Sequence, residues 1–137
     1  MLKAATSAAV VTHIHPDGDA VGSQIALVRL LERLGIEAVP VLPDSLPSNF
    51  QFLDPGRQCL TPDDPRAERA IARADCLAVV DVSRSDRLGK LMQPVLAAGG
   101  RRVCIDHHTD GDFPAQDRKS TRLNSSHIQK SRMPSSA

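Results

Sequence analysis

The sequence is poor in aromatic residues: its 137 residues include three Phe, no Trp and no Tyr. Proteins that bind single-stranded nucleic acid by stacking bases on aromatic rings need more such side chains, so the composition argues against that class. The apolar volume must come from Leu, Val, Ile and Ala, yet hydrophobic residues still make up 41% of the chain. This composition is typical of a parallel sheet flanked by helices, and the length suits one domain.

Cysteine, long apolar segments and net charge are also scarce. The three cysteines (Cys59, Cys76 and Cys104) lack metal-ligand spacing, and their odd number without a secretory context predicts reduced thiols in the cytoplasm. No apolar run is long enough to span a membrane, and the N-terminus lacks a signal-peptide pattern. The formal net charge is +1. Residues 117–137 hold five basic residues and one acidic residue, which leaves 12 basic and 15 acidic residues in residues 1–116. We therefore expect no broad basic surface for duplex nucleic acid.

Predicted strands and helices alternate along the chain. Apolar runs predict four strands, over residues 8–12, 36–42, 76–80 and 102–105. Helical spacing predicts three helices, over residues 20–34, 64–74 and 86–98. The loop 43–56 carries Phe50, Phe52 and Leu53, which we expect to pin it to the core. The alternation predicts an α/β fold, a Rossmann-like parallel β-sheet with flanking helices and right-handed crossovers.

Histidines and carboxylates follow three of these strands. The first strand leads into His13-Ile14-His15-Pro16-Asp17-Gly18-Asp19, the third ends at Asp81, and the last ends at Asp106-His107-His108. Parallel strands place their carboxyl ends on one edge of the sheet, so we expect the three clusters to converge. His and Asp are ligands that suit Mn²⁺, Mg²⁺ or Zn²⁺.

The first cluster also has a purely structural interpretation. Pro16 and Gly18 allow a sharp turn that would aim His13, Asp17 and Asp19 into one space. Asp and His are equally common in ordinary loops, and Asp19 could simply cap the helix that follows. The coincidence of three clusters at three strand ends favours a site over that alternative.

These residues resemble the motifs of the DHH phosphoesterase family. The segment His13-x-x-Pro16-Asp17-Gly18-Asp19-Ala20-x-Gly22-Ser23 is similar to the first motif, Val80-Asp81 to the second, and Ile105-Asp106-His107-His108 to the third, which names the family. Leu34-Gly35 and the loop 43–56 resemble the NrnA-like branch, which contains bifunctional oligoribonuclease and 3′-phosphoadenosine-5′-phosphate phosphatases. The resemblance covers residues 5–115.

The resemblance implies a two-metal site. His13 and Asp17 would bind the first ion, Asp19 and His107 would bind the second, and Asp81 would bridge both. The family usually employs Mn²⁺, with Mg²⁺ or Co²⁺ as alternatives. A carboxylate that holds two ions about 4 Å apart provides the arrangement needed to generate hydroxide and stabilise the leaving oxygen.

Two further residues receive catalytic roles from the same resemblance. His108 would contact the substrate phosphate, and Asp106 would orient or support the histidines rather than serve as a primary ligand. His15 stands where the branch often has Asn, so we do not expect it to be a ligand.

The implied parent is a cytoplasmic, manganese-dependent phosphoesterase that hydrolyses short oligoribonucleotides or 3′-phosphoadenosine 5′-phosphate. It would have no membrane partner, and a homodimer of the intact parent remains open. Alternatives within the family are a RecJ-like single-strand exonuclease and a family II pyrophosphatase; the alternative of another class is a non-catalytic nucleotide- or metal-binding module. The family's later metal-binding Asp and its C-terminal substrate-gripping domain have no counterpart here. We therefore expect the chain to be an inactive N-terminal fragment.

The last residues differ in character from the rest. Residues 117–137 are polar, Ser-rich and aperiodic, which predicts disorder, and a basic arm for nucleic acid is one interpretation. We favour another: residues 117–127 and 131–137 can be encoded, in one frame and in order, by strings resembling a common short-read sequencing adapter. The expected organisation is therefore a DHH-domain portion over 1–116 and a non-native tail over 117–137, in which His127 is no ligand.

Overall fold

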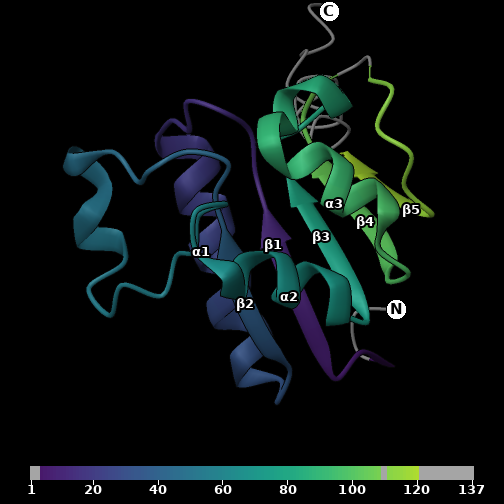
Figure 1. Cartoon of the computed structure of the whole chain (residues 1–137), viewed down its shortest axis with the longest axis horizontal. Helices are drawn as coiled ribbons and strands as arrows, with labels where there is room; N and C mark the ends of the chain where they lie inside the picture. Colours follow the sequence, from purple (N-terminus) through teal and green to yellow (C-terminus); the bar gives the residue numbers. More distant parts are fainter. Residues whose placement is uncertain (1–3, 109–110, 121–137) are drawn as a thin grey trace, which may run out of the picture.

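The computed structural model describes residues 4–108 and 111–120. In this part of the chain five strands form one parallel sheet with the order β2-β1-β3-β4-β5 (Figure 1). The strands are β1 (Ser7–Val11), β2 (Glu37–Val41), β3 (Cys76–Val80), β4 (Arg101–Asp106) and β5 (Asp117–Ser120). The predicted α/β fold with a parallel sheet is confirmed.

Three α-helices and two 3₁₀ segments connect the described strands. They are α1 (Gly18–Arg33), η2 (Ser48–Leu53), α2 (Pro65–Arg73), η3 (Ser85–Leu91) and α3 (Met92–Ala97). The N-cap of α1 is Asp17, whose Oδ1 accepts a hydrogen bond from the amide of Ala20 at 2.9 Å, so Asp19 does not cap this helix. Gly35, with φ +79°, ends the same helix in the left-handed conformation that glycine adopts readily.

The sheet buries apolar side chains on both faces. Ala8 and Val10 of β1 belong to a core cluster with Val28 and Leu31 of α1. The alternate residues of β1, Ala9 and Val11, belong to the opposite cluster, which contains the buried side chains of α2 and α3. Figure 1 shows α2 and α3 in front of the sheet. Burial on both faces explains why the predicted strands are continuous apolar runs.

The helix predicted over residues 86–98 is wrong in its first half. The chain there forms η3 and then α3, and Gly89 inside η3 breaks the helical geometry with φ +54° and ψ −126°. Leu88, Leu91 and Val95 are all buried, so their spacing imitated a continuous helix. A Cβ built at Gly89 would lie 2.6 Å from Cγ2 of Ile14, which shows how closely η3 approaches the loop after β1.

The loop 43–56 is anchored differently from the expectation. Phe52 is 73% exposed, so it does not pin the loop to the core. Phe50 is half-buried, and a Cβ built at Gly18 would lie 3.3 Å from its ring. Leu53 is also half-buried. The 3₁₀ geometry of η2 explains the difference, because it separates the side chains of Phe50 and Phe52.

The start of the predicted disordered tail also differs from the expectation. Residues Asp117–Ser120 form β5, which pairs with β4 from Val103↔Asp117 to Asp106↔Ser120. The physical reason is that β4 would otherwise expose its backbone groups at a sheet edge, and backbone pairing does not require apolar side chains. Residues 121–137, including His127, lie outside the described residues, and the non-native origin of 117–137 stays a prediction.

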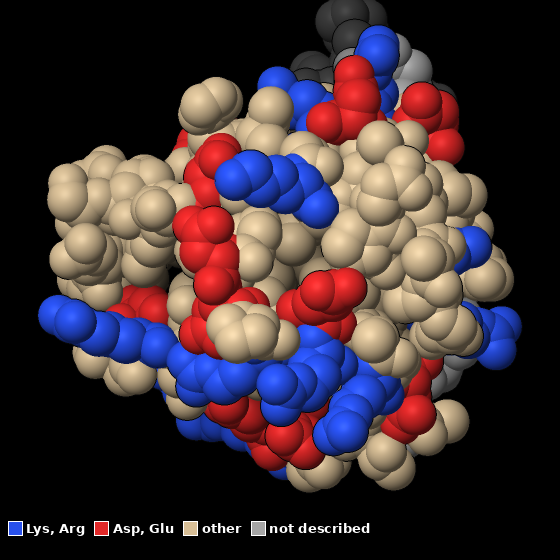
Figure 2. Space-filling model, viewed as in Figure 1, with Lys and Arg blue, Asp and Glu red and all other residues tan. Residues whose placement is uncertain are grey.

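The surface mixes acidic and basic side chains (Figure 2). A band of basic side chains crosses the lower part of the face shown, over α2, which carries Arg66, Arg69 and Arg73. These arginines line a groove of about 520 Å³ along α2 and β2. None of the helices in the described ranges combines the length and apolarity needed to cross a bilayer.

Candidate metal centre

The strand order reverses between β1 and β3. After β1 the chain adds β2 on one side of it, and the next strand, β3, pairs with its other side. In open α/β sheets this reversal leaves a crevice at the carboxyl ends of the strands, where ligands bind. His13 follows β1 and Asp81 follows β3 at this crevice, and the neighbouring β4 ends at Asp106.

The backbone holds Asp81 in an unusual conformation. Its φ is +57°, a left-handed value that costs free energy for residues other than glycine. Its amide donates a hydrogen bond to the carbonyl of Ile105 at 2.9 Å, so the chain remains attached to β4 while it turns. The residue is only 8% exposed. A charged side chain in a strained, buried position is typical of a functional site.

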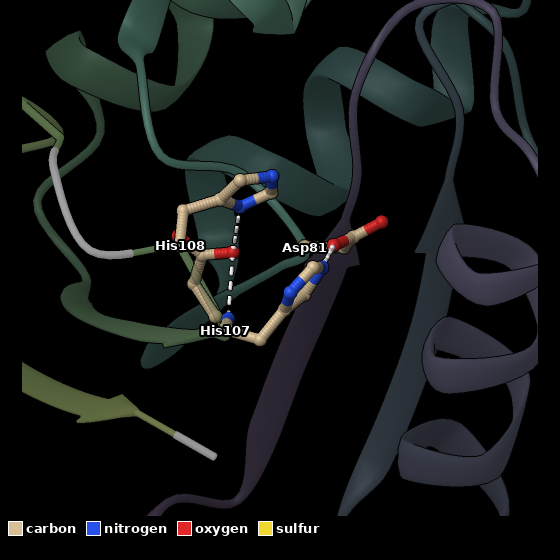
Figure 3. A group of neighbouring side chains, drawn as sticks. Asp81, His107 and His108 are labelled. Carbon is tan, nitrogen blue, oxygen red and sulfur yellow. Dashed lines mark hydrogen bonds and ion pairs between the residues drawn. The ribbon is translucent and has the colours of Figure 1, made fainter. Parts of the chain in front are cut away.

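The carboxylate of Asp81 lies between two histidines from different loops. Its Oδ2 is 3.3 Å from Nε2 of His13, and its Oδ1 is 3.0 Å from Nε2 of His107. Figure 3 shows the ring of His107 directed at Asp81. Each oxygen therefore faces a separate imidazole, so this one carboxylate joins the two loops that carry the predicted histidine ligands.

The first group of donors consists of His13, Asp17 and Asp81. One ligand atom of each lies within 4.8 Å of the others, and Nε2 of His13 is 3.9 Å from Oδ1 of Asp17. Nδ1 of His13 lies 2.6 Å from the carbonyl oxygen of Ile14. A proton on Nδ1 would be donated to that carbonyl and would leave the Nε2 lone pair directed at the two carboxylates, as a metal ligand requires.

The second group contains Asp81, Asp106, His107 and His108, whose ligand atoms also lie within 4.8 Å of one another. Asp19 approaches it, with Oδ2 3.6 Å from Nε2 of His107. Asp81 is common to both groups. The structure thus brings together all five residues predicted as metal ligands, and their roles as ligands stay predictions.

Asp106 supports the two histidines that follow it. It is buried, and its Oδ1 accepts hydrogen bonds from the amide of His107 at 2.9 Å and from Nδ1 of His108. The two imidazole rings lie 4.3 Å apart. These contacts fit the orienting role predicted for Asp106, because they fix the ring of His108 and leave its Nε2 for other partners.

His15 lies outside both groups. Its side chain is exposed, its φ is +48°, and its amide donates to Oδ2 of Asp44 at 2.9 Å. That His15 is no ligand stays a prediction.

Buried carboxylate oxygens without hydrogen bonds test whether cations fit this site. Among the described residues, Oδ1 of Asp81 and Oδ2 of Asp106 are buried and accept no hydrogen bond of good geometry, although Nε2 of His107 lies 3.0 Å from the first and Nη2 of Arg118 lies 3.6 Å from the second. A buried carboxylate oxygen without a well-formed hydrogen bond costs free energy, and a bound cation would offset that cost. The donor set of imidazoles and carboxylates, with Asp81 at its centre, therefore fits divalent cations.

A cavity of about 480 Å³ opens beside these residues. Sequence reasoning missed three of its lining residues, Ser83, Arg84 and Arg87. The available signal was the polar segment of residues 83–87, two residues after Asp81, because it places two arginines close in sequence to a predicted metal ligand. The complete lining is His13, Asp17, Asp19, Asp81, Ser83, Arg84, Arg87, His107 and His108.

Comparison with known proteins agrees with this geometry. The model of the DHH family, N-terminal domain, matches residues 7–132. A solved structure of an exopolyphosphatase-related protein from Bacteroides fragilis is similar, with 26% sequence identity and a TM-score of 0.81. The match covers 87% of this chain and 36% of that one, so the chain spans about a third of the length of this relative. The family model matches most of the chain, which therefore belongs to the DHH family through its N-terminal domain.

Proposed function

We propose that the chain is the N-terminal part of a manganese-dependent phosphoesterase that hydrolyses short oligoribonucleotides or 3′-phosphoadenosine 5′-phosphate. The observation that carries the proposal is the position of Asp81 between His13 and His107. The short coverage of the solved relative supports a longer active protein, in which further residues complete the site.

The residues present would divide two cations between them. His13 and Asp17 would hold one, Asp19 and His107 the other, and Asp81 would contact both. Two bound cations of this type supply activation of water at neutral pH and stabilisation of negative charge on the phosphate and the leaving oxygen. Mn²⁺ suits the mixture of imidazole and carboxylate, and Mg²⁺ or Co²⁺ are alternatives.

His108 would act on the substrate rather than on the cations. Asp106 accepts a hydrogen bond from its Nδ1, and its ring lines the cavity, so His108 in its doubly protonated form would donate from Nε2 to a phosphate oxygen. The pair resembles other carboxylate–histidine arrangements in which the carboxylate selects the tautomer and orients the ring.

A second candidate within the family is a pyrophosphatase or polyphosphatase activity. The specific observation in its favour is the name of the solved relative, which is described as exopolyphosphatase-related. Both candidates require the same cations and differ in what lies beyond the phosphate that is attacked.

The test is a comparison of the chain with the longer protein encoded by contiguous genomic DNA, both supplied with Mn²⁺. The substrates are a ribodinucleotide, 3′-phosphoadenosine 5′-phosphate, single-stranded DNA, pyrophosphate and polyphosphate. We expect the longer protein to favour the first two and the chain alone to turn over little or nothing. Preference for pyrophosphate or polyphosphate would select the second candidate, and no hydrolysis of any substrate would reject the proposal.

A further inference from the structure

Arg87 places a positive charge beside the candidate metal centre. Its Nη2 lies 3.3 Å from Nδ1 of His13, and the residue lines the same cavity. Within residues 4–108 and 111–120, no carboxylate lies within ion-pair distance of Arg87. Arg84 on the same rim differs, because its guanidinium forms a two-point contact with Asp86 at 3.1 and 3.2 Å.

The backbone of Arg87 is fixed against the loop that carries His13. The carbonyl of Arg87 accepts a hydrogen bond from the amide of Ile14 at 2.7 Å, and its amide donates to the carbonyl of Arg84 at 3.1 Å. Ile14 also leaves no room for a side chain at Gly89, two residues further along the same segment. The long side chain of Arg87 therefore pivots from a fixed point at the edge of the cavity.

The contact between Arg87 and His13 is not one that a ligating His13 would keep. Nδ1 of His13 has two neighbours, the carbonyl of Ile14 at 2.6 Å, which can only accept, and the guanidinium of Arg87, which can only donate. When Nε2 is a ligand, Nδ1 carries the proton and donates to Ile14. Arg87 then faces another donor, so its guanidinium gains nothing by remaining against His13.

An anionic group in the cavity is the natural partner for the released guanidinium. A guanidinium can bind two oxygens of one phosphate at once, and such charge-assisted contacts are stronger than hydrogen bonds between neutral groups. We propose that Arg87 binds a phosphate oxygen of the substrate beside the metal centre. This inference rests on the proposed phosphoesterase function and assigns Arg87 to the recognition of its phosphate group.

The test measures binding separately from hydrolysis. Mn²⁺ is titrated into the 137-residue chain by calorimetry, and inorganic phosphate is then titrated into the Mn²⁺-loaded chain. The variants are Arg87→Met and Arg87→Lys, with Arg69→Met as the matched control, because Arg69 is an exposed arginine of α2 that lines the separate groove.

We expect Arg87→Met to keep Mn²⁺ affinity within about threefold and to weaken phosphate binding about tenfold or more, because a charge-assisted contact is lost. Arg87→Lys should restore part of the phosphate affinity, and Arg69→Met should match the unmodified chain. Unchanged phosphate affinity in Arg87→Met, or no phosphate binding by the unmodified Mn²⁺-loaded chain, would overturn the inference. If Arg87 binds phosphate but the longer protein hydrolyses none of the substrates above, the proposed function fails while this role of Arg87 stands.

Discussion

Asp81 shows at the scale of one residue how a site can oppose stability. Its φ of +57° raises the free energy of the cation-free chain, and so does the burial of Oδ1, which accepts no hydrogen bond of good geometry although Nε2 of His107 lies 3.0 Å away. Both features are explained if the position serves to hold cations, because the free energy of cation binding then offsets the loss of folding stability.

The substitution Asp81→Asn tests this explanation. Asparagine keeps the shape of the side chain and tolerates left-handed backbone angles, but it removes the charge. We expect Mn²⁺ affinity to fall by at least about 100-fold, because even indirect partners of metal ligands cost 10–100-fold when lost. The melting temperature without Mn²⁺ should be equal or higher.

Calorimetric titration with Mn²⁺ and thermal unfolding in a chelator provide the two measurements. Asp63→Asn, which changes an exposed carboxylate in a loop, is the control and should leave both unchanged. If the Asp81 variant bound Mn²⁺ as tightly as the unmodified chain, the proposal that Asp81 bridges two cations would be wrong.

At the scale of elements, η3 connects the core to the site. Leu88 and Leu91 are buried in the core cluster, while Arg87, the residue before Leu88, contacts the side chain of His13. Gly89 permits both, because its backbone angles are open only to glycine and its lack of a side chain admits Ile14.

Gly89→Ala should therefore destabilise the chain and disturb the site together. The new Cβ would lie 2.6 Å from Ile14, and the strained backbone alone costs about 1–3 kcal/mol. Gly99→Ala is the matched control, since a Cβ there has no atom within 4 Å. Urea unfolding measures the first effect and Mn²⁺ titration the second. Equal stability of the two variants would show that the kink at Gly89 is unnecessary.

The elements that the sequence predicts well are those in which one physical signal dominates. The strand of residues 76–80 is apolar throughout and buried, residues 103–105 of the last predicted strand are apolar too, and Asp81 and Asp106 follow directly after these runs. The break at Gly89 was missed because burial in a 3₁₀ segment and in a helix produces similar spacing. The approach of Arg87 to His13 was invisible for a related reason: it depends on that break, and no local pattern records a contact between loops.

At the scale of the whole molecule, the fold buries Cys76 and Cys104 fully and Cys59 in part, and this burial changes how readily their thiols ionise. Burial is the main cause that raises the pKa of Cys59 to about 12, and the hydrogen bond and negative charge of Asp54 raise it further. Burial raises the pKa of Cys104 to about 11 and raises the pKa of Cys76 as well. Folded thiols therefore remain protonated and unreactive where unfolded thiols ionise.

Alkylation by iodoacetamide at pH 8 should consequently follow unfolding. An ordinary thiol has a pKa of about 8.5, so a value near 12 leaves roughly a thousandfold less thiolate. We expect slow modification in buffer and rapid modification of all three cysteines in urea, followed by mass spectrometry. The pH dependence has a definite sign: the unfolded state loses thiol protons first, so stability should fall as pH rises above about 8.5. Rapid modification of Cys59 in buffer would show that its loop opens independently.

The wide sequence separation of the three strand ends has a consequence for folding during synthesis on the ribosome. His13 leaves the ribosome long before Asp81, and the histidines after β4 leave later still. Until the chain has emerged to about residue 108 and the parallel strands have paired, a non-local step that is intrinsically slow, a cation could meet only part of the predicted ligand set. Ions that bind at the candidate metal centre would therefore not guide early folding. They would stabilise the finished sheet and slow its unfolding rather than speed its formation.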